Sequence, residues 1–186
     1  ALCVLAASAM LLRRSRGAAA YTVFLSGYGS LTLSVVILLA YQAACGYVYE
    51  RIGLITALFM AGAAAGARLA RDSSRPLILL RTLEAAAAAL FVCAPVFFRH
   101  EALLLLLSAL AGGLGGALFS AAAGYLAAGN GASAGRLYAL DLAGSCLGAL
   151  FAALITVPLI GLYPTVLLVV LLKLISLSLL FTLRHA

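Results

Sequence analysis

Charged side chains are scarce in this sequence. They make up 9% of the 186 residues, and Asp and Glu together account for only five positions, whereas hydrophobic residues make up 66%. A soluble globular domain is about 25% charged and about 45–50% apolar. The composition therefore excludes an ordinary soluble domain. It also excludes an intrinsically disordered chain, which requires low hydrophobicity and high charge.

Sequence motifs for enzyme catalysis are missing as well. The chain has no glycine-rich dinucleotide loop, no phosphate-binding loop and no HExxH, and its two histidines lie at the ends of predicted helices. None of the cysteines forms a CxxC pair, and each lies in or beside an apolar run, as small buried hydrophobic residues do. These cysteines are Cys3, Cys45, Cys93 and Cys146. We therefore expect no catalytic residue, no metal site and no cofactor in this chain.

Long apolar runs dominate the sequence, whose mean hydropathy is +1.21. A membrane-spanning helix requires roughly 20 apolar residues. The runs are separated by charged residues or by Gly and Pro, which predicts an all-α integral membrane protein with a six-helix transmembrane bundle. The expected helices span about 19–45, 46–70, 76–98, 102–128, 136–160 and 161–183.

The sequence opens inside a further apolar run. Residues 1–12 are too short to span a membrane, and a basic cluster follows them instead of preceding them, unlike in a signal peptide. We expect residues 1–17 to hold the end of a truncated transmembrane helix and a basic cytoplasmic turn. Residues 18–186 are expected to form the six-helix bundle, so that the chain is a fragment of a longer protein.

The net charge of +7 is distributed unequally between alternate loops. One set of loops contains two arginines, Arg51 and Arg99, each close to an acidic residue. The other set contains Arg13, Arg14, Arg16, Arg68, Arg71, Arg75, Arg136 and Arg184. Loops rich in arginine remain in the cytoplasm, which predicts a multi-pass protein with a cytoplasmic C-terminus. Topology explains the positive charge, so we expect a lipid bilayer and no nucleic acid as partner.

Glycine pairs with the spacing GxxxG occur in three of the predicted helices. They are Gly62–Gly66, Gly112–Gly116 and Gly144–Gly148. Small residues at this spacing let two helices approach closely in a membrane. The pattern indicates a tight and mobile bundle, or close packing alone.

Two basic and two acidic residues within the helices need partners, because charge inside a membrane is costly. Arg81 and Glu84 lie three residues apart on the third helix, which predicts an ion pair between them. This pair is either structural or part of a substrate or proton path. Lys173 lies midway along the sixth helix, where we expect a cavity or an acidic partner.

Asp141 lies about one and a half turns into the fifth helix, where its short side chain cannot reach the interface. We expect its partner to be Arg68 or Arg71 at the end of the second helix, forming either a structural latch or a gate. On the first helix, Tyr28 and Gln42 are further candidates for substrate binding or gating. Tyr28 is flanked by glycines that leave space beside the helix.

The stretch 66–81, GARLARDSSRPLILLR, resembles the cytoplasmic turn between the second and third helices of one half of a major facilitator superfamily carrier. Gly66, Arg71, Asp72 and Arg75 match that motif. Six helices with both ends in the cytoplasm also fit one such half. The resemblance implies a transporter-like half bundle that is completed by a second helical half.

The stretch 135–165 is similar to the membrane region of bacterial proteins that fuse a transporter-like bundle to a spermidine synthase domain. The matching residues are Gly135, Arg136, Tyr138, Ala139, Asp141, Gly144, Gly148, Ala149 and Leu150, and the likeness covers about residues 21–183. It implies a module of the bacterial inner membrane that handles a polyamine or another small organic solute. The alternative is a non-transporting anchor for a synthase-like domain, or a structural subunit of a larger complex. Any aminopropyltransferase activity would reside in a domain outside this sequence.

Overall fold

A computed structural model describes residues 15–46, 49–71, 73, 75–98, 100–127 and 133–182. This part of the chain is helical and contains no strand. Its elements are α2 (Ser15–Cys45), α3 (Tyr49–Ala70), α4 (Pro76–Phe97), α5 (Glu101–Ala127), α6 (Ser133–Phe151), the π-helical turn η1 (Ala152–Thr156), α7 (Val157–Ile160) and α8 (Leu162–Thr182). They supply six segments long and apolar enough to cross a membrane, as the sequence predicts.

The observed helix ends lie close to the predicted ones. One difference is that α2 begins at Ser15, inside the stretch expected to be a basic turn, while residues 1–14 lie outside the described part. Pro76 begins α4, since a proline has no N–H to leave unpaired in a first turn. The predicted fifth helix consists of α6, η1 and α7, and it stops at Gly161, whose φ of +91° favours glycine.

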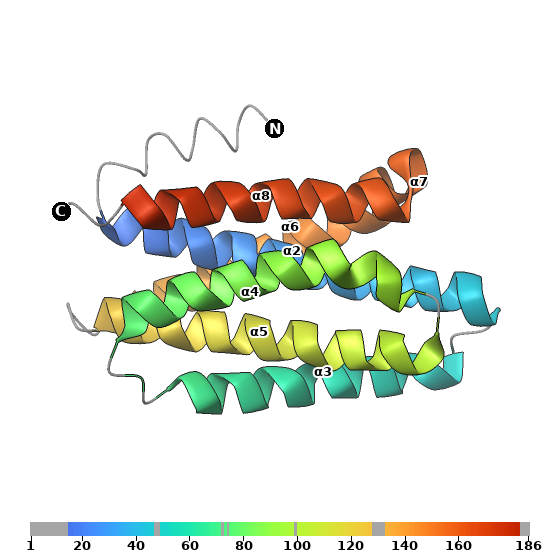
Figure 1. Cartoon of the computed structure of the whole chain (residues 1–186), viewed down its shortest axis with the longest axis horizontal. Coiled ribbons are helices and arrows are strands. Elements are labelled where there is room, and N and C mark those ends of the chain that lie inside the picture. Colours follow the sequence, from blue (N-terminus) through green and yellow to red (C-terminus); the bar gives the residue numbers. More distant parts are fainter. Residues whose placement is uncertain are drawn as a thin grey trace.

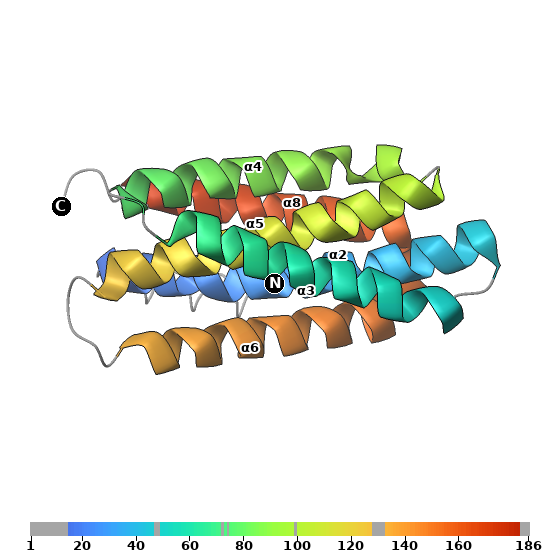
Figure 2. The same cartoon turned by 90° about the horizontal axis from the view of Figure 1, so that it is seen from below.

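Four helices form a ring and the other two lie outside it. Within the ring, α2 packs against α5, α5 against α4, α4 against α8, and α8 against α2. The outer helices α3 and α6 pack mainly on α5 and α2, respectively, and Figures 1 and 2 show them at the periphery. Large apolar side chains are exposed on every long helix except α2, among the described residues. Such an outer surface suits a lipid environment.

Glycine sets the closest contacts in the bundle, at all three predicted GxxxG steps. A Cβ atom at Gly66 would overlap the carbonyl oxygen of Gly113, and one at Gly148 would overlap that of Tyr28. The same holds for Gly62 against Ala109, Gly112 against Phe59, Gly116 against Ala63 and Gly144 against Phe24. The expected close approach is therefore confirmed between α3 and α5 and between α6 and α2.

The helices run antiparallel, so that the described arginines of the α3–α4 and α5–α6 connections share one end of the bundle (Figure 1). We call this the basic end; α2 begins there and α8 ends there. Arg68, Arg71, Arg75 and Arg136 are exposed at it. The predicted clustering of basic residues is confirmed for these four positions.

The opposite end holds an exposed ion pair that joins two different connections. Arg51 Nε lies 3.4 Å from Glu101 Oε1, and the Tyr41 hydroxyl donates a hydrogen bond of 2.8 Å to the same oxygen. The acidic partner of Arg51 is therefore on α5. Tyr41, itself buried, ties α2 to this pair.

Candidate functional site: a buried ion pair between α4 and α8

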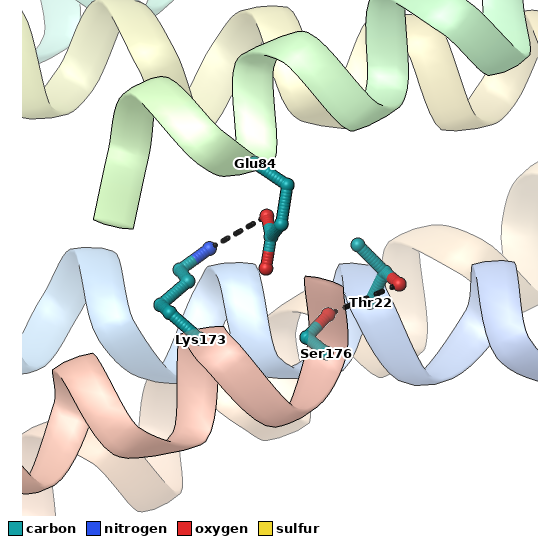
Figure 3. A network of polar contacts seen from close by, with 4 residues as sticks. All are labelled: Thr22, Glu84, Lys173 and Ser176. Carbon is teal, nitrogen blue, oxygen red and sulfur yellow. Dashed lines mark hydrogen bonds and ion pairs between the residues drawn. The ribbon is translucent and has the colours of Figure 1, made fainter. Parts of the chain in front are cut away.

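Glu84 of α4 and Lys173 of α8 form an ion pair inside the ring. Lys173 Nζ donates a hydrogen bond of 3.0 Å to Glu84 Oε2, and the two side chains are 2% and 0% exposed. Figure 3 shows the two side chains pointing toward each other from facing helices. Of the two alternatives predicted for Lys173, a cavity or an acidic partner, the structure shows the acidic partner, which is Glu84.

The predicted pairing of Arg81 with Glu84 is wrong. Arg81 donates hydrogen bonds from Nε and Nη2 to the carbonyl oxygen of Leu180, at 3.1 and 2.9 Å, and its guanidinium lies 5.4 Å from the centre of the Phe181 ring. Carbonyl groups in the last turn of α8 lack intrahelical donors, so a guanidinium satisfies them well. Arg81 reaches toward the basic end, while Glu84 points into the ring.

The pair lies deep along both helices. Glu84 is eight residues from Pro76, the nearer end of α4, and Lys173 is nine residues from Thr182, the nearer end of α8. At 1.5 Å per residue these separations are about 12 and 14 Å. Half of a 30 Å hydrocarbon layer is about 15 Å. A bilayer around these helices would therefore have the pair near its middle.

Hydroxyl groups follow the pair toward the basic end. Ser176, one turn beyond Lys173 on α8, donates a hydrogen bond of 3.2 Å to Thr22 Oγ1 of α2, and both are buried (Figure 3). Ser26 of α2 is buried one turn from Thr22. We call Thr22, Ser26, Glu84, Lys173 and Ser176 the polar seam.

Apolar side chains fill the ring on the other side of the pair. Gly29 of α2 leaves room for the lysine stem, because a Cβ there would come within 3.4 Å of Lys173 Cε and of Phe91 and within 3.2 Å of Val169. Beyond that point the interior is an apolar cluster that extends to the opposite end. Its buried members include Leu33, Val36, Ile37, Phe91, Leu104, Leu107, Val166, Val169 and Val170. A second apolar cluster lies toward the basic end and includes Val23, Leu80, Leu118, Ala122 and Leu180, so the pair and its hydroxyl neighbours lie between two apolar regions.

The hydrogen bonding of the pair is incomplete. Glu84 Oε1 is buried and has no hydrogen-bond partner among the described residues. Leaving a buried acceptor unpaired costs about 1–3 kcal/mol, and more when the group is charged. Native proteins keep few such groups, and Thr156 Oγ1 is the other one among the described residues.

Asp141 does not meet α3, contrary to the prediction. It lies on α6, which packs on α2, while Arg68 and Arg71 lie on α3 and just beyond it, and α3 packs on α5. No ion pair reaches Asp141 from the described residues; instead its carboxylate lies over Gly27 of α2, where a Cβ would come within 2.8 Å of Oδ1.

The remaining predicted residues lie apart from the polar seam. Gln42 is exposed near the end of α2, and Tyr28 is half-buried and packs against the apolar cluster. Of the loop motif, Gly66 lies at the crossing of α3 and α5, and Arg71 and Arg75 are exposed at the basic end. Asp72 lies outside the described residues.

Two cysteines also depart from expectation. Cys93 and Cys146 are exposed on α4 and α6, where apolar side chains form the outer surface, and they are not buried. Within the described ranges no three or more His, Cys, Asp or Glu residues gather as a metal site would require.

Comparison with models of protein families, with curated proteins and with solved structures returned no match.

Proposed function

We propose that the chain is a multi-pass membrane module, comparable to one half of a major-facilitator-type carrier, that handles a polyamine or another small organic solute. The observation that carries this proposal is the Glu84–Lys173 pair, buried about half a bilayer from the nearer helix ends. Ionisable side chains at such depth are costly, and in membrane proteins they mark substrate and ion pathways.

The chemistry of the seam suits a charged solute. The carboxylate of Glu84 can bind an ammonium group and the ammonium of Lys173 can bind an anionic one, while hydroxyls on Thr22 and Ser176 accept or donate hydrogen bonds. The hydroxyls of the seam lie on the side of the basic end, and apolar clusters enclose the pair on both sides. Alternating access would require the helices to part at one end of the bundle at a time.

The orientation is part of the same proposal. The arginines at the basic end favour its placement in the cytoplasm, as positive loops do in other multi-pass proteins. The C-terminus would then be cytoplasmic as well, and the bacterial inner membrane is the location that the sequence resemblance implies. A second helical half or a synthase-like domain would be the natural partner.

Flux measurements in cells test the proposal. Uptake and efflux of labelled spermidine, putrescine and a neutral solute of similar size are compared in cells that produce the protein containing this chain. The variants are the wild type, Glu84→Gln, and Thr82→Ala as a control, since Thr82 is exposed on the same helix. We expect the wild type and the control to change the flux of an amine, and Glu84→Gln to abolish that change.

Unchanged flux in every strain, at equal protein levels in the membrane, would contradict transport and favour the alternative, a membrane anchor or structural subunit. One observation supports that alternative. The hydrogen bonds from Arg81 to the Leu180 carbonyl oxygen, which we call the Arg81 clamp, and the Glu84–Lys173 pair both tie α4 to α8, as a static scaffold would.

A further inference from the structure

Three arginines surround the connection between α3 and α4 at the basic end. Arg68 lies in the last turn of α3, Arg71 follows that helix and Arg75 precedes α4, and all three are exposed. The sequence places one acid, Asp72, among them, so the segment 68–75 has three positive charges against one negative charge. The distribution of arginine between loops accounts for the side of a membrane on which these residues lie. It does not account for their place beside exposed apolar side chains.

No described acidic side chain forms an ion pair with these arginines. Glu84 is bound to Lys173 inside the ring. Glu101 is bound to Arg51 at the opposite end. Asp141 lies on α6, which packs on α2, whereas α3 and α4 pack on α5. The three guanidinium groups are therefore available to an external anion, and their planar fork fits the oxygens of a phosphate group.

The outer apolar surface begins directly beside the arginines. Leu69, next to Arg68, is 87% exposed, and Ile78, three residues after Arg75, is 52% exposed. The span of α3 is also the least buried of the six. Positive groups at the end of an exposed apolar surface suit an amphipathic ligand, which a free anion in water is not.

The arginines lie at the depth of a lipid head group. The apolar span of α3, from Arg51 to Ala70, has 20 residues. At 1.5 Å per residue this is about 30 Å, the thickness of the hydrocarbon layer. Arg68 is two residues from the end of that span, and Arg75 directly precedes the span of α4. Long arginine side chains at such positions extend into the polar layer.

The surface between the two helices has room for a ligand at this end. The helices α3 and α4 pack on α5 rather than on each other. Near the end of α5, Gly124 is exposed, and a Cβ there would meet only the Cβ of Pro76, 4.0 Å away. A phosphate group bound by Arg68 and Arg75 would link two helices that have α5 as their common neighbour.

We propose that the arginines of the α3–α4 connection bind the phosphate of an anionic phospholipid, whose acyl chains lie along the exposed apolar surfaces of α3 and α4. Phosphatidylglycerol, with one net negative charge, represents this class. A phosphatidylcholine has the same phosphate, but the positive net charge of the connection repels its cationic group. The inference needs the membrane location that is part of the proposed function, and it does not need transport.

A single tryptophan can measure the lipid composition next to this site, because the sequence contains no tryptophan. The basic-end probe is Ile78→Trp. The control probe is Val96→Trp, 64% exposed and 18 residues further along α4, which is five full turns and thus the same face of the helix. The purified protein is placed in vesicles that contain mixtures of phosphatidylglycerol and phosphatidylcholine, one of which has brominated acyl chains. Bromine quenches the tryptophan that it contacts.

We expect the basic-end probe to favour phosphatidylglycerol roughly fivefold or more, since one arginine near an anionic surface contributes about that factor. The control probe should show little preference. The triple variant Arg68→Gln, Arg71→Gln and Arg75→Gln should lower the basic-end preference to that of the control. Arg136→Gln, which removes an exposed arginine of α6 at the same end, should keep the preference. Concentrated salt should weaken it without any substitution, because salt screens exposed charges.

Four results would overturn the proposal. They are an equal preference at both probes, a preference that persists in the triple variant, an equal loss in Arg136→Gln, and loss of the preference in millimolar inorganic phosphate. The third result would indicate a diffuse field of the whole basic end, and the fourth a site for a soluble anion. Flux is not measured in this experiment, so a failure of lipid binding and a failure of transport are distinguishable.

Discussion

Removal of the charges on Glu84 and Lys173, singly and together, is the sharpest test of the site. Each side chain is almost completely buried, and each is the other's ion-pair partner among the described residues. Loss of one member leaves an uncompensated buried charge, which costs about 3–5 kcal/mol. Replacement of both members with uncharged side chains of similar size is often neutral or stabilising.

We therefore expect Lys173→Met to lower the free energy of unfolding by about 3–5 kcal/mol, because it leaves a carboxylate with both oxygens unpaired. Glu84→Gln should cost less, about 1.5–3 kcal/mol, since its amide oxygen can still accept a hydrogen bond from the lysine. The double variant should unfold within about 1 kcal/mol of the wild type. Mutations at distant, independent sites add to within about 0.3–0.5 kcal/mol. The non-additivity expected for Glu84 and Lys173 is well above that range.

Reversible unfolding in mixed detergent micelles measures these differences, and Arg81 supplies the matched control. A cycle of Arg81→Met with Glu84→Gln should be close to additive, because Arg81 binds the Leu180 carbonyl and not Glu84. Additive effects for Glu84 and Lys173, or strong coupling between Glu84 and Arg81, would refute the geometry described above.

Three further predictions follow from the packing and the charges. Arg81→Met should lower the free energy of unfolding by about 1.5–3 kcal/mol, the range for hydrogen bonds to charged groups, and a thermal shift measures it. Gly66→Ala should destabilise by about 1–3 kcal/mol, because its Cβ meets the Gly113 carbonyl oxygen, whereas Gly53→Ala, with open space around it on the same helix, should be neutral or stabilising by up to about 1 kcal/mol. A single cysteine at Ser73 should react with an impermeant reagent only after the cells are opened, because the basic end is expected in the cytoplasm. Labelling in intact cells would show that the orientation is the opposite one.

The spans of the helices could be predicted from sequence because each depends on local composition. Apolar runs set their lengths, and Pro76 and Gly161 mark ends that the structure confirms. The glycine steps were equally readable, since the spacing Gly144–Gly148 produces a smooth helix face whatever helix meets it. The sequence analysis did not predict the π-helical turn. The available signal was Pro158 just after it, because a proline gives no N–H to the carbonyl group four residues earlier.

The partners of the buried charges could not be predicted in the same way. Spacing along one helix shows which residues share a face, so Arg81 and Glu84 were paired, but it contains no information about which helix lies opposite. Glu84 meets Lys173 across 89 positions of sequence. The expectation for Asp141 failed for the same reason, because loop lengths do not reveal that α6 packs on α2. Charge balance was the one usable signal, since a mid-helix lysine requires an acid.

The glycine contacts also determine where this bundle can bend. At the glycine contacts one backbone lies directly against another, and no flexible side chain lies between them to absorb a displacement. We therefore expect α3 to move together with α5, and α2 together with α6. The helices α4 and α8 carry no such partner and are joined to each other by an ion pair and a guanidinium clamp. We therefore expect α4 and α8 to move more readily than the two glycine-packed pairs, and the polar contacts between α4 and α8 to resist that movement.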